Sequence, residues 1–390
     1  MYYHMDKKPV ILPPKTFAFK TMDISGEDAR RDGRVKHLLV DFDSTIPNLA
    51  LMKISAWARA RGDGVELVKV LWKNEQPLVP IRFFEISADE CWVSCIFTWH
   101  RRHAESLKHY SAKMHYGGTG FDWGLGDGLD FSQRVNLPSE IEACRPDYSL
   151  YPDDERALGF CLRGCNRTCG FCDVWRKEGK IRRDKYNRIT EWVPNDRSKV
   201  LLLDNDIALY GNDLHDEIIN DCASTGRKLS ITQGYDIRCV TEKRAAMLAE
   251  HKPWDLKFKE KRLYIAWDKM SSENAVRRNI PLLLDAGFKG REIFCYMVCS
   301  WEDYPEHGED YFPMCDTFHQ DMYRFKVLWE EFGVYPFVMI YNNRKDNPRL
   351  RAFARWVNRR VHKNHSWEEY DRNPDILEEE YDVVEQLTLG

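Results

Sequence analysis

Four of the chain's twelve cysteines lie within a dozen residues. The stretch from residue 159 to residue 172 reads Gly-Phe-Cys-Leu-Arg-Gly-Cys-Asn-Arg-Thr-Cys-Gly-Phe-Cys. Its last three cysteines, Cys165, Cys169 and Cys172, have the spacing C-x3-C-x2-C. Three thiolates on one tight loop can each bind one iron of a cubane [4Fe-4S] cluster, whose usual complement is four cysteines. The spacing therefore predicts an iron–sulfur cluster with one iron that the loop leaves open.

These cysteines, with the aromatic Phe171 directly before the last of them, resemble the signature of the radical S-adenosylmethionine (SAM) enzymes. The resemblance implies that the amine and carboxylate of SAM chelate the open iron. One electron passed through the cluster then cleaves SAM and yields a 5′-deoxyadenosyl radical. The resemblance also implies that Phe171 packs near the adenine. In such enzymes the cofactor carries the difficult chemistry, while the protein positions it and excludes water.

Two other interpretations of the cysteines are a structural zinc site and an inert core. Structural zinc takes four ligands, usually as C-x2-4-C pairs separated by a longer spacer. Cys161 could supply a fourth thiolate, but the chain has no second C-x-x-C pair. Free cysteines are often core residues, yet a loop that contains glycine and arginine is not typical of a core. We favour the cluster, with Cys161 as a neighbour at the end of a strand and not a ligand.

The composition is that of an ordinary globular protein. The 390 residues, long enough for two domains, are 43% hydrophobic and 31% charged, and the net charge of −4 gives no global basic field for nucleic acid. No apolar run approaches the ~20 residues of a membrane span. The first residues lack the apolar core of a signal peptide, and the cysteine spacing is irregular. We therefore expect a cytoplasmic protein with no membrane partner.

The first part of the chain predicts a small α/β domain. We interpret residues 1–34 as an irregular N-terminal arm and residues 35–150 as a doubly wound, Rossmann-like domain. The apolar and helical periods predict the following elements: strands over Val35–Val40, Val65–Leu71 and Cys91–Trp99, a helix from an N-cap at Asn48 to about Arg61, and a helix near Arg102–Ala112.

This domain resembles the cobalamin-binding-like domain that precedes many radical SAM catalytic domains. Three stretches carry the resemblance, namely Ile46–Ser55, Arg61–Val65 and the loop Gly117–Gly120. Some cobalamin domains bind the lower face of the cobalt through the histidine of an Asp-x-His-x-x-Gly motif. This motif is absent between residues 35 and 150. A histidine-ligated cobalamin is therefore not supported. Cobalamin bound without a protein ligand stays open, as does a role in packing or substrate docking.

After residue 150 strands and helices alternate regularly. The strand candidates are Ala157–Leu162, Lys199–Leu203, Lys228–Thr232, Arg262–Ala266, Glu292–Val298 and Tyr335–Ile340. The helix candidates include Asp213–Ala223, Glu242–Glu250, Ser272–Ala286 and Cys315–Glu331. Six units are too few for a closed eight-stranded barrel, but they match the open (β/α)6 partial TIM barrel of the resembled family. We place this barrel at residues 151–345 and a C-terminal helical tail at residues 346–390.

Catalytic groups in such barrels lie at the C-terminal ends of strands. The second strand ends in Asp204-Asn205-Asp206, and the resemblance implies that Asp204 and Asn205 receive the amino group of SAM. A turn-forming Asp/Asn cluster is the alternative. After the third strand, Gln233 and Arg238 could bind the ribose or carboxylate of SAM, or the substrate. An exposed ion pair of Asp236 with Arg238, worth little energetically, is equally open.

Three further segments follow predicted strands and would lie at the same end of the barrel (its mouth), namely Trp267–Lys269, Cys299–Trp301 and Tyr341–Arg344. Cys299 or Tyr341 could donate a hydrogen atom, although a buried thiol or phenol at a strand end more often only packs. The basic segment Trp175–Arg183 could steer an anionic substrate or an electron donor such as flavodoxin or ferredoxin, or be a solvated loop. The basic helical segment Arg349–His365 could contact nucleic acid.

The sequence thus predicts a radical SAM enzyme that modifies an unidentified small molecule or nucleic acid. Taken whole, the chain resembles a group of such proteins found in bacteria and their phages, which indicates no substrate. Two rivals stay open. One is a cobalamin-dependent radical SAM methyltransferase. The other is a zinc-stabilised nucleic-acid-binding protein without catalysis, which would use Cys161 as its fourth ligand.

Overall fold

The computed structural model describes residues 33–73, 76–109, 112–121, 137–183, 185–299, 317–341 and 347–372. The chain divides into two compact units, residues 1–155 and 156–389, and we describe each by itself. Nearly all of the expected N-terminal arm and the last residues of the expected C-terminal tail, 373–390, lie outside the described residues.

The first unit contains a parallel four-stranded sheet in the order β2-β1-β5-β6. The strands are β1 (Lys36–Asp41), β2 (Gly64–Lys69), β5 (Glu90–Ser94) and β6 (Lys113–Gly117). The chain places β2 on one side of β1 and β5 on the other, so the strand order reverses between β1 and β5, as in doubly wound folds. Residues 37 to 41 of β1 are all buried, as expected for a parallel strand that is covered on both faces.

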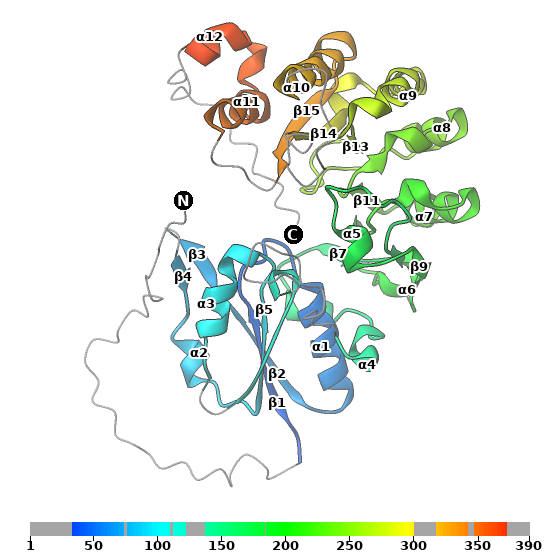
Figure 1. The fold of residues 1–390 in the computed structure, drawn as a ribbon. Coiled ribbons are helices and arrows are strands. Elements are labelled where there is room, and N and C mark those ends of the chain that lie inside the picture. The colour runs from blue at the N-terminus through cyan, green and yellow to red at the C-terminus, as the bar shows by residue number, and fades with distance from the viewer. Residues whose placement is uncertain are drawn as a thin grey trace. The chain divides into compact units, whose positions relative to one another are not determined.

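Helices lie on both faces of this sheet (Figure 1). They are α1 (Leu49–Ala60) on one face and the short α2 (Arg82–Glu85) and α3 (Arg101–Ser106) on the other. Asn48 caps α1 as expected, because its side-chain oxygen accepts a hydrogen bond from the backbone N–H of Leu51 (3.2 Å). The remaining elements are the hairpin of β3 (Leu71–Lys73) and β4 (Gln76–Leu78), and α4 (Ser139–Glu142).

Two expected elements of this unit are shorter than predicted. The strand expected over Cys91–Trp99 ends at Ser94, because the backbone N–H groups of Ile96 and Phe97 bind the carboxylate of Asp43 (2.7 and 2.9 Å). The helix expected over Arg102–Ala112 ends at Ser106. The hydroxyl of Ser106 bonds back to the carbonyl of His103, a local bond that competes with the helix.

The glycine loop Gly117–Gly120 packs against the end of β5. Gly118 has a φ of +96°, and a Cβ there would lie 2.4 Å from the carbonyl oxygen of Cys95. Only glycine permits this backbone conformation and this close approach. The loop therefore has a packing role, and its contact with a cofactor stays a prediction.

The second unit contains all six expected strands, with ends shifted by a few residues. They are β7 (Arg156–Gly159), β10 (Lys199–Leu202), β11 (Lys228–Ile231), β13 (Leu263–Ala266), β14 (Ile293–Cys299) and β15 (Tyr335–Ile340). The strand expected to continue to Leu162 ends at Gly159, because the N–H groups of Cys161 and Leu162 bind the carboxylate of Asp204 instead of a neighbouring strand.

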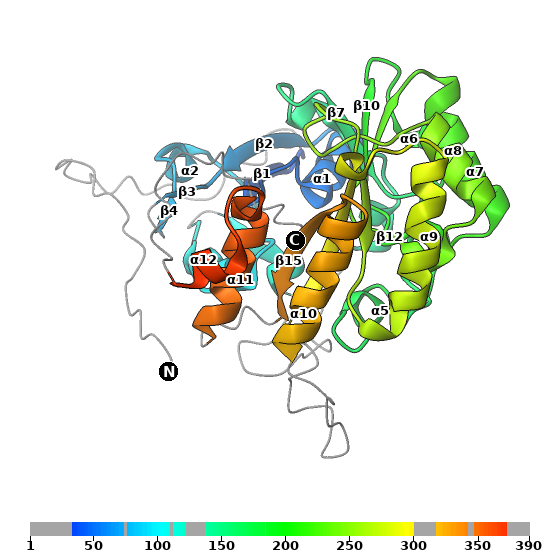
Figure 2. The same ribbon diagram turned by 90° about the horizontal axis from the view of Figure 1, so that it is seen from above.

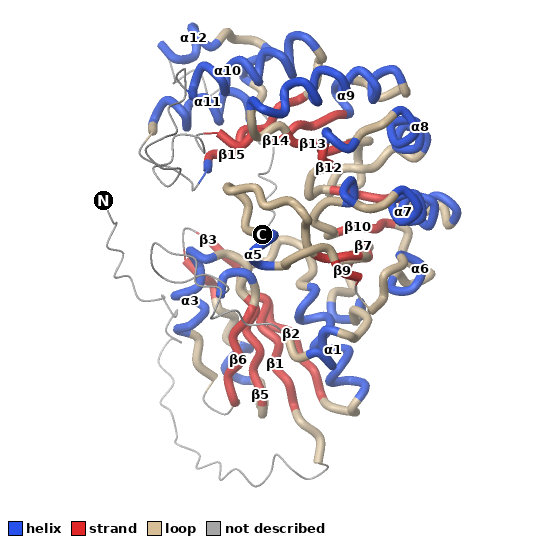
Figure 3. Tube along the Cα trace, turned by 45° about the vertical axis from the view of Figure 1, so that its right-hand side comes forward, coloured by secondary structure: helices blue, strands red, loops and turns tan. Residues whose placement is uncertain are grey.

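These strands form two parallel sheets, β11-β10-β7 and β12-β13-β14-β15, which the described residues do not close into a barrel (Figure 3). The short β12 (Tyr235–Asp236) follows β11 directly in the chain and pairs with β13, so the third strand contributes to both sheets. The hydroxyl of Tyr296 on β14 donates to the carbonyl of Thr232, at the break between β11 and β12 (2.9 Å).

Helices connect the strands and lie along their outer side (Figure 2). They are α6 (Ile189–Trp192), α7 (Asn212–Ser224), α8 (Glu242–Glu250), α9 (Glu273–Asp285) and α10 (Thr317–Lys326), which continues as a π-helical turn over Val327–Glu331. Cys315, the expected start of the last helix, lies outside the described residues. None of the helices in the described part of the chain is both long and apolar enough to cross a bilayer.

Two helices follow β15, namely α11 (Pro348–Asn358) and α12 (Trp367–Arg372). In α11, Phe353 and Trp356 are buried while Arg351 and Arg355 are exposed, so the helix has an apolar and a basic face. Contact of this basic face with nucleic acid stays a prediction.

His362 lies beneath α11 among the rings of Phe325, Trp329 and Trp356. Burial lowers its pKa from the usual 6.5 to about 4, and its Nε2 has no hydrogen-bond partner. In the folded protein, His362 therefore binds a proton only near pH 4 and below, whereas in the unfolded chain it binds one below about pH 6.5. We expect this residue alone to cost about 3 kcal/mol of unfolding free energy as the pH falls from 6.5 to 4. Urea titrations across this range, compared with His362→Phe, measure the difference; parallel curves for the two proteins would contradict it.

Candidate metal and cofactor site

The three motif cysteines lie in a loop whose ends are joined by a small antiparallel hairpin. Its strands are β8 (Leu162–Arg163) and β9 (Arg182–Arg183), and the loop between them contains α5 (Val174–Lys177). The backbone N–H of Cys172 and the indole N–H of Trp175 both donate to the carbonyl of Cys169 (3.1 Å each). These bonds bring the last two cysteines of the motif together before any metal binds.

The thiols of Cys165, Cys169 and Cys172 are partly exposed and unbridged. Burial, with a smaller contribution from the other two thiols, raises the pKa of Cys172 to about 11, so the thiols lie within electrostatic reach of one another. No three His, Cys, Asp or Glu side chains among the described residues gather around one ion position. A zinc site needs four ligands on a single ion, whereas each thiolate of a [4Fe-4S] cluster binds a different iron. The cluster at these three cysteines stays a prediction.

Cys161 is buried, and its role as a neighbour of the motif and not a ligand stays a prediction. Its thiol interacts with Trp192 and lies near Asp221 and Cys222, and burial raises its pKa well above the usual value. The zinc-bound rival needs this thiol as its fourth ligand.

Asp204 and Asn205, after β10, hold the backbone that leads into the cysteine loop. The buried carboxylate of Asp204 accepts hydrogen bonds from the N–H groups of Cys161 and Leu162 (2.8 Å each) and the hydroxyl of Tyr210 (2.9 Å). The Oδ1 of Asn205 accepts one from the N–H of Gly164 (2.9 Å). The expected contact of both residues with SAM stays a prediction, and in this structure groups of the protein occupy both carboxylate oxygens of Asp204.

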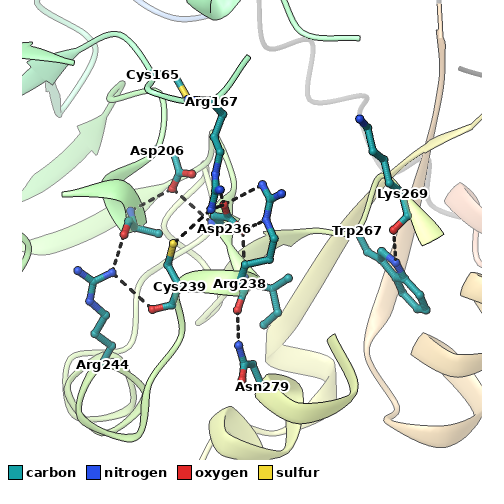
Figure 4. Close-up of polar contacts among 12 residues, drawn as sticks. Cys165, Arg167, Asp206, Asp236, Arg238, Cys239, Arg244, Trp267, Lys269 and Asn279 are labelled. Atoms are coloured by element: carbon teal, nitrogen blue, oxygen red, sulfur yellow. Dashed lines mark hydrogen bonds and ion pairs between the residues drawn. The ribbon is translucent and has the colours of Figure 1, made fainter. Parts of the chain in front are cut away.

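Two arginines hold Asp236 on β12 (Figure 4). Arg238 binds it with both prongs of the guanidinium, Nε to Oδ1 (2.7 Å) and Nη2 to Oδ2 (2.8 Å). Arg167, which lies between Cys165 and Cys169, reaches across to the same Oδ2 (2.7 Å). Asp236 is only 8% exposed, and although burial opposes its ionisation, the arginines hold its pKa below the usual range. The ion pair of Asp236 with Arg238 that the sequence left open is thus present, with the carboxylate buried and the Arg238 side chain 40% exposed.

Asp206 lies beside this network. Its Oδ1 accepts hydrogen bonds from the N–H groups of Ala208 (3.0 Å) and Asp236 (3.3 Å). Burial, reinforced by the charge of Asp236, raises the pKa of Asp206 to about 7. A carboxyl group with this pKa loses its proton readily when a cation binds beside it. The sequence indicates that Asp206 belongs to the turn but shows no role for its side chain.

The other predicted residues of the mouth are placed as follows. Phe171 lies 5.8 Å from the ammonium of Lys269, measured to the ring centroid, so the cysteine loop meets the end of β13. Gln233 is partly buried at the break between β11 and β12. Cys299 is fully buried, with its sulfur 3.9 Å from Arg324 Nη2, which suits packing better than hydrogen-atom donation. Tyr341 is partly buried, and Trp301 and Arg344 lie outside the described residues.

Sequence reasoning missed Arg167, although it lies inside the cysteine motif. Its Nη2 also lies 3.8 Å from the sulfur of Cys239, which follows β12. The signal was an arginine between two predicted ligands and an acidic residue at the end of the neighbouring strand. Spacing along the chain did not show that the two would meet.

In the first unit, the end of β1 and the loop after β5 meet where the strand order reverses, which is the usual ligand crevice of doubly wound folds. Here the carboxylate of Asp43 binds the N–H groups of Ile96 and Phe97 together with Nδ1 of His100 (3.1 Å). The backbone N–H groups of this loop are therefore already hydrogen-bonded to a carboxylate of the chain, that of Asp43.

No protein-family model matches the sequence, and no curated protein matches it. The fold is similar to solved structures of the "Cobalamin-dependent S-adenosylmethionine radical enzyme OxsB". The form with aqua-cobalamin and S-adenosylmethionine bound has 14% identity and a TM-score of 0.42, over 68% of this chain and 49% of that one. The apo form has 13% identity and a TM-score of 0.41 over the same shares. The chain thus spans about half the length of these structures. Similarity at this level assigns no activity.

Gly164 allows the start of the cysteine loop to lie against its end. It has a φ of +93°, and a Cβ there would lie 2.4 Å from the carbonyl oxygen of Lys180, whereas at Gly179 (φ +75°) nothing lies within 4 Å. Gly164→Ala and Gly179→Ala both incur the left-handed penalty of about 1–2 kcal/mol. We expect Gly164→Ala to lose a further 1–3 kcal/mol or so, because backbone must move. Urea unfolding of both variants tests this, and equal losses would contradict the close approach.

Proposed function

We propose that this chain is a radical SAM enzyme. The observation that carries the proposal is the loop of three partly exposed thiols, tied by Asp204 and Asn205 to the end of β10 and by Arg167 to the end of β12. In this proposal the strands β7, β10, β11 with β12, β13, β14 and β15 form the open (β/α)6 barrel, and an electron donor such as flavodoxin or ferredoxin supplies the electron. The substrate is an unidentified small molecule or nucleic acid.

Cys165, Cys169 and Cys172 would hold a [4Fe-4S] cluster. When bound, such a cluster and SAM together supply a 5′-deoxyadenosyl radical that removes a hydrogen atom from the substrate. The chain's own part is to keep three thiols on one loop, to hold Arg167 and Arg238 beside them, and to present acceptors at the end of β10. Phe171, whose ring lies beside the ammonium of Lys269, is proposed to pack near the adenine of SAM.

Within this proposal, Asp206 is the acceptor for the ammonium group of SAM. Asp204 already accepts three hydrogen bonds from the chain, whereas Asp206 accepts two, both through Oδ1. Burial raises the pKa of both Asp204 and Asp206 to about 7, so the hydrogen bonds and not the pKa favour Asp206 as the acceptor. Gln233 at the break of the third strand is proposed to contact SAM or the substrate.

Cobalamin is not part of the proposal. The loop amides at the crevice of the first unit bind Asp43, and the sequence lacks a cobalt-ligating histidine motif. Tightly bound corrinoid in protein produced with cobalamin available would favour the methyltransferase rival instead.

The cluster is tested first. Anaerobically reconstituted protein is expected to hold about four irons and four sulfides per chain, with absorbance near 400 nm, and to form 5′-deoxyadenosine from SAM after dithionite reduction. Cys169→Ala is expected to lose the cluster and the product, because two thiolates do not retain the cubane. Cys144→Ala, a partly exposed thiol of the first unit, is the control and should keep both. Equal product from Cys169→Ala and wild type would reject the proposal, as would one tightly bound zinc ion.

Asp206→Asn and Asp204→Asn separate cofactor binding from positioning. Losing a charged hydrogen bond costs roughly 1.5–3 kcal/mol, so we expect Asp206→Asn to weaken SAM binding about tenfold or more with little change in stability. Asp204→Asn is expected to lower the unfolding free energy by about 1–3 kcal/mol, because an amide N–H₂ replaces one acceptor of buried N–H groups. Equilibrium dialysis with SAM and urea unfolding measure the two effects. The opposite pattern would assign the ammonium contact to Asp204.

A further inference from the structure

The guanidinium of Arg238 is fixed beside a predicted cluster ligand. Its Nε and Nη2 bind the two oxygens of Asp236, and its side chain also interacts with the thiol of Cys169. Asp236 is itself held from the other side by Arg167 of the cysteine loop. The position of Arg238 is thus set by groups of the chain and does not depend on a bound cofactor.

The contact with SAM or the substrate that the sequence predicted for Arg238 stays a prediction, and this geometry gives the side chain a further role. A guanidinium presents two edges with a pair of parallel N–H groups, and one edge of Arg238, formed by Nε and Nη2, binds Asp236. What it still presents is a positive charge with remaining N–H donors next to Cys169. Hydrogen bonds to the sulfurs and nearby charge are among the properties that set the reduction potential of an iron–sulfur cluster.

We propose that Arg238, held in place by Asp236, raises the reduction potential of the cluster bound through Cys169. The inference rests on the proposed function, because it requires a cluster at these cysteines. The reaction concerned is the transfer of one electron from a donor to the cluster, with no bond formed or broken. The cluster gains one negative charge, and a fixed guanidinium stabilises the reduced form more than the oxidised form. Arg238 is therefore a positioned charge that helps a donor protein to reduce the cluster.

The experiment is a potentiometric titration of the full-length, reconstituted protein without SAM, followed by the EPR signal of the reduced cluster. We expect Arg238→Gln to lower the equilibrium constant for reduction about tenfold, which is about 59 mV for one electron. Arg238→Lys keeps the positive charge but loses the paired N–H groups that bind Asp236. Its reduction potential is expected to lie between those of wild type and Arg238→Gln. Because SAM is absent, a residue that only binds the cofactor would leave the potential unchanged.

Arg176→Gln is the matched control. Arg176 lies in the same loop, its side chain is 35% exposed against 40% for Arg238, and it pairs with Asp173 (3.3 Å). The variant removes the same charge at a site with no contact to Cys169 among the interactions of the described residues. Its potential is expected to stay close to that of wild type. An equal shift in both variants would mean that only net charge matters, and would overturn the specific role of Arg238.

The outcomes separate the two proposals. If wild-type protein binds no cluster, the proposed function fails. If wild type and Arg238→Gln hold equal iron and titrate at the same potential, only the inference about Arg238 fails. If neither Arg238 variant retains a cluster while Arg176→Gln does, Arg238 has a structural role and the inference is again overturned.

Discussion

The candidate site depends on one buried interaction, the carboxylate of Asp204 bound to the N–H groups of Cys161 and Leu162. Beyond Gly159 the chain leaves the sheet, and its N–H groups need new acceptors, since an unpaired buried donor costs about 1–3 kcal/mol. Asp204 supplies them from the end of the next strand. The direction in which the cysteine loop departs is thus set by the strand that follows it.

The break in the third strand is the second constraint. Because β11 pairs with β10 and β12 pairs with β13, the residues between them belong to neither sheet. Tyr296 satisfies the carbonyl of Thr232 at this point, and Asp236 emerges on β12 facing Arg167. A strand without the break would place this carboxylate elsewhere along the sheet edge. The break between β11 and β12 therefore connects the packing of β14, through Tyr296, to the ion pair of Asp236 with Arg167 beside the cysteines.

The sequence predicted the elements better than the contacts. Apolar runs indicated all six strands of the second unit, and the N-cap at Asn48 was confirmed, because both depend on local pattern. The strand expected to reach Leu162 was too long, since its end is decided by Asp204, over forty residues away. Arg167 and Asp236 are likewise distant in sequence and meet only through the order of the strands. Spacing identified three candidate ligands, but their surroundings depend on pairings that no periodicity encodes.

Electrostatics explains why two arginines share one carboxylate here. Asp236 neutralises one guanidinium, so the group of Arg167, Asp236 and Arg238 is positive overall. Three thiolates and their cluster would add negative charge to a partly buried loop, where charges interact more strongly than in water. A cation that is already fixed needs little rearrangement when that charge arrives, whereas a mobile arginine would first lose conformational freedom. The ion pairs with Asp236 therefore suit the anionic cluster proposed for this loop, and Asp206, with a pKa near 7, suits the cation proposed to bind beside it.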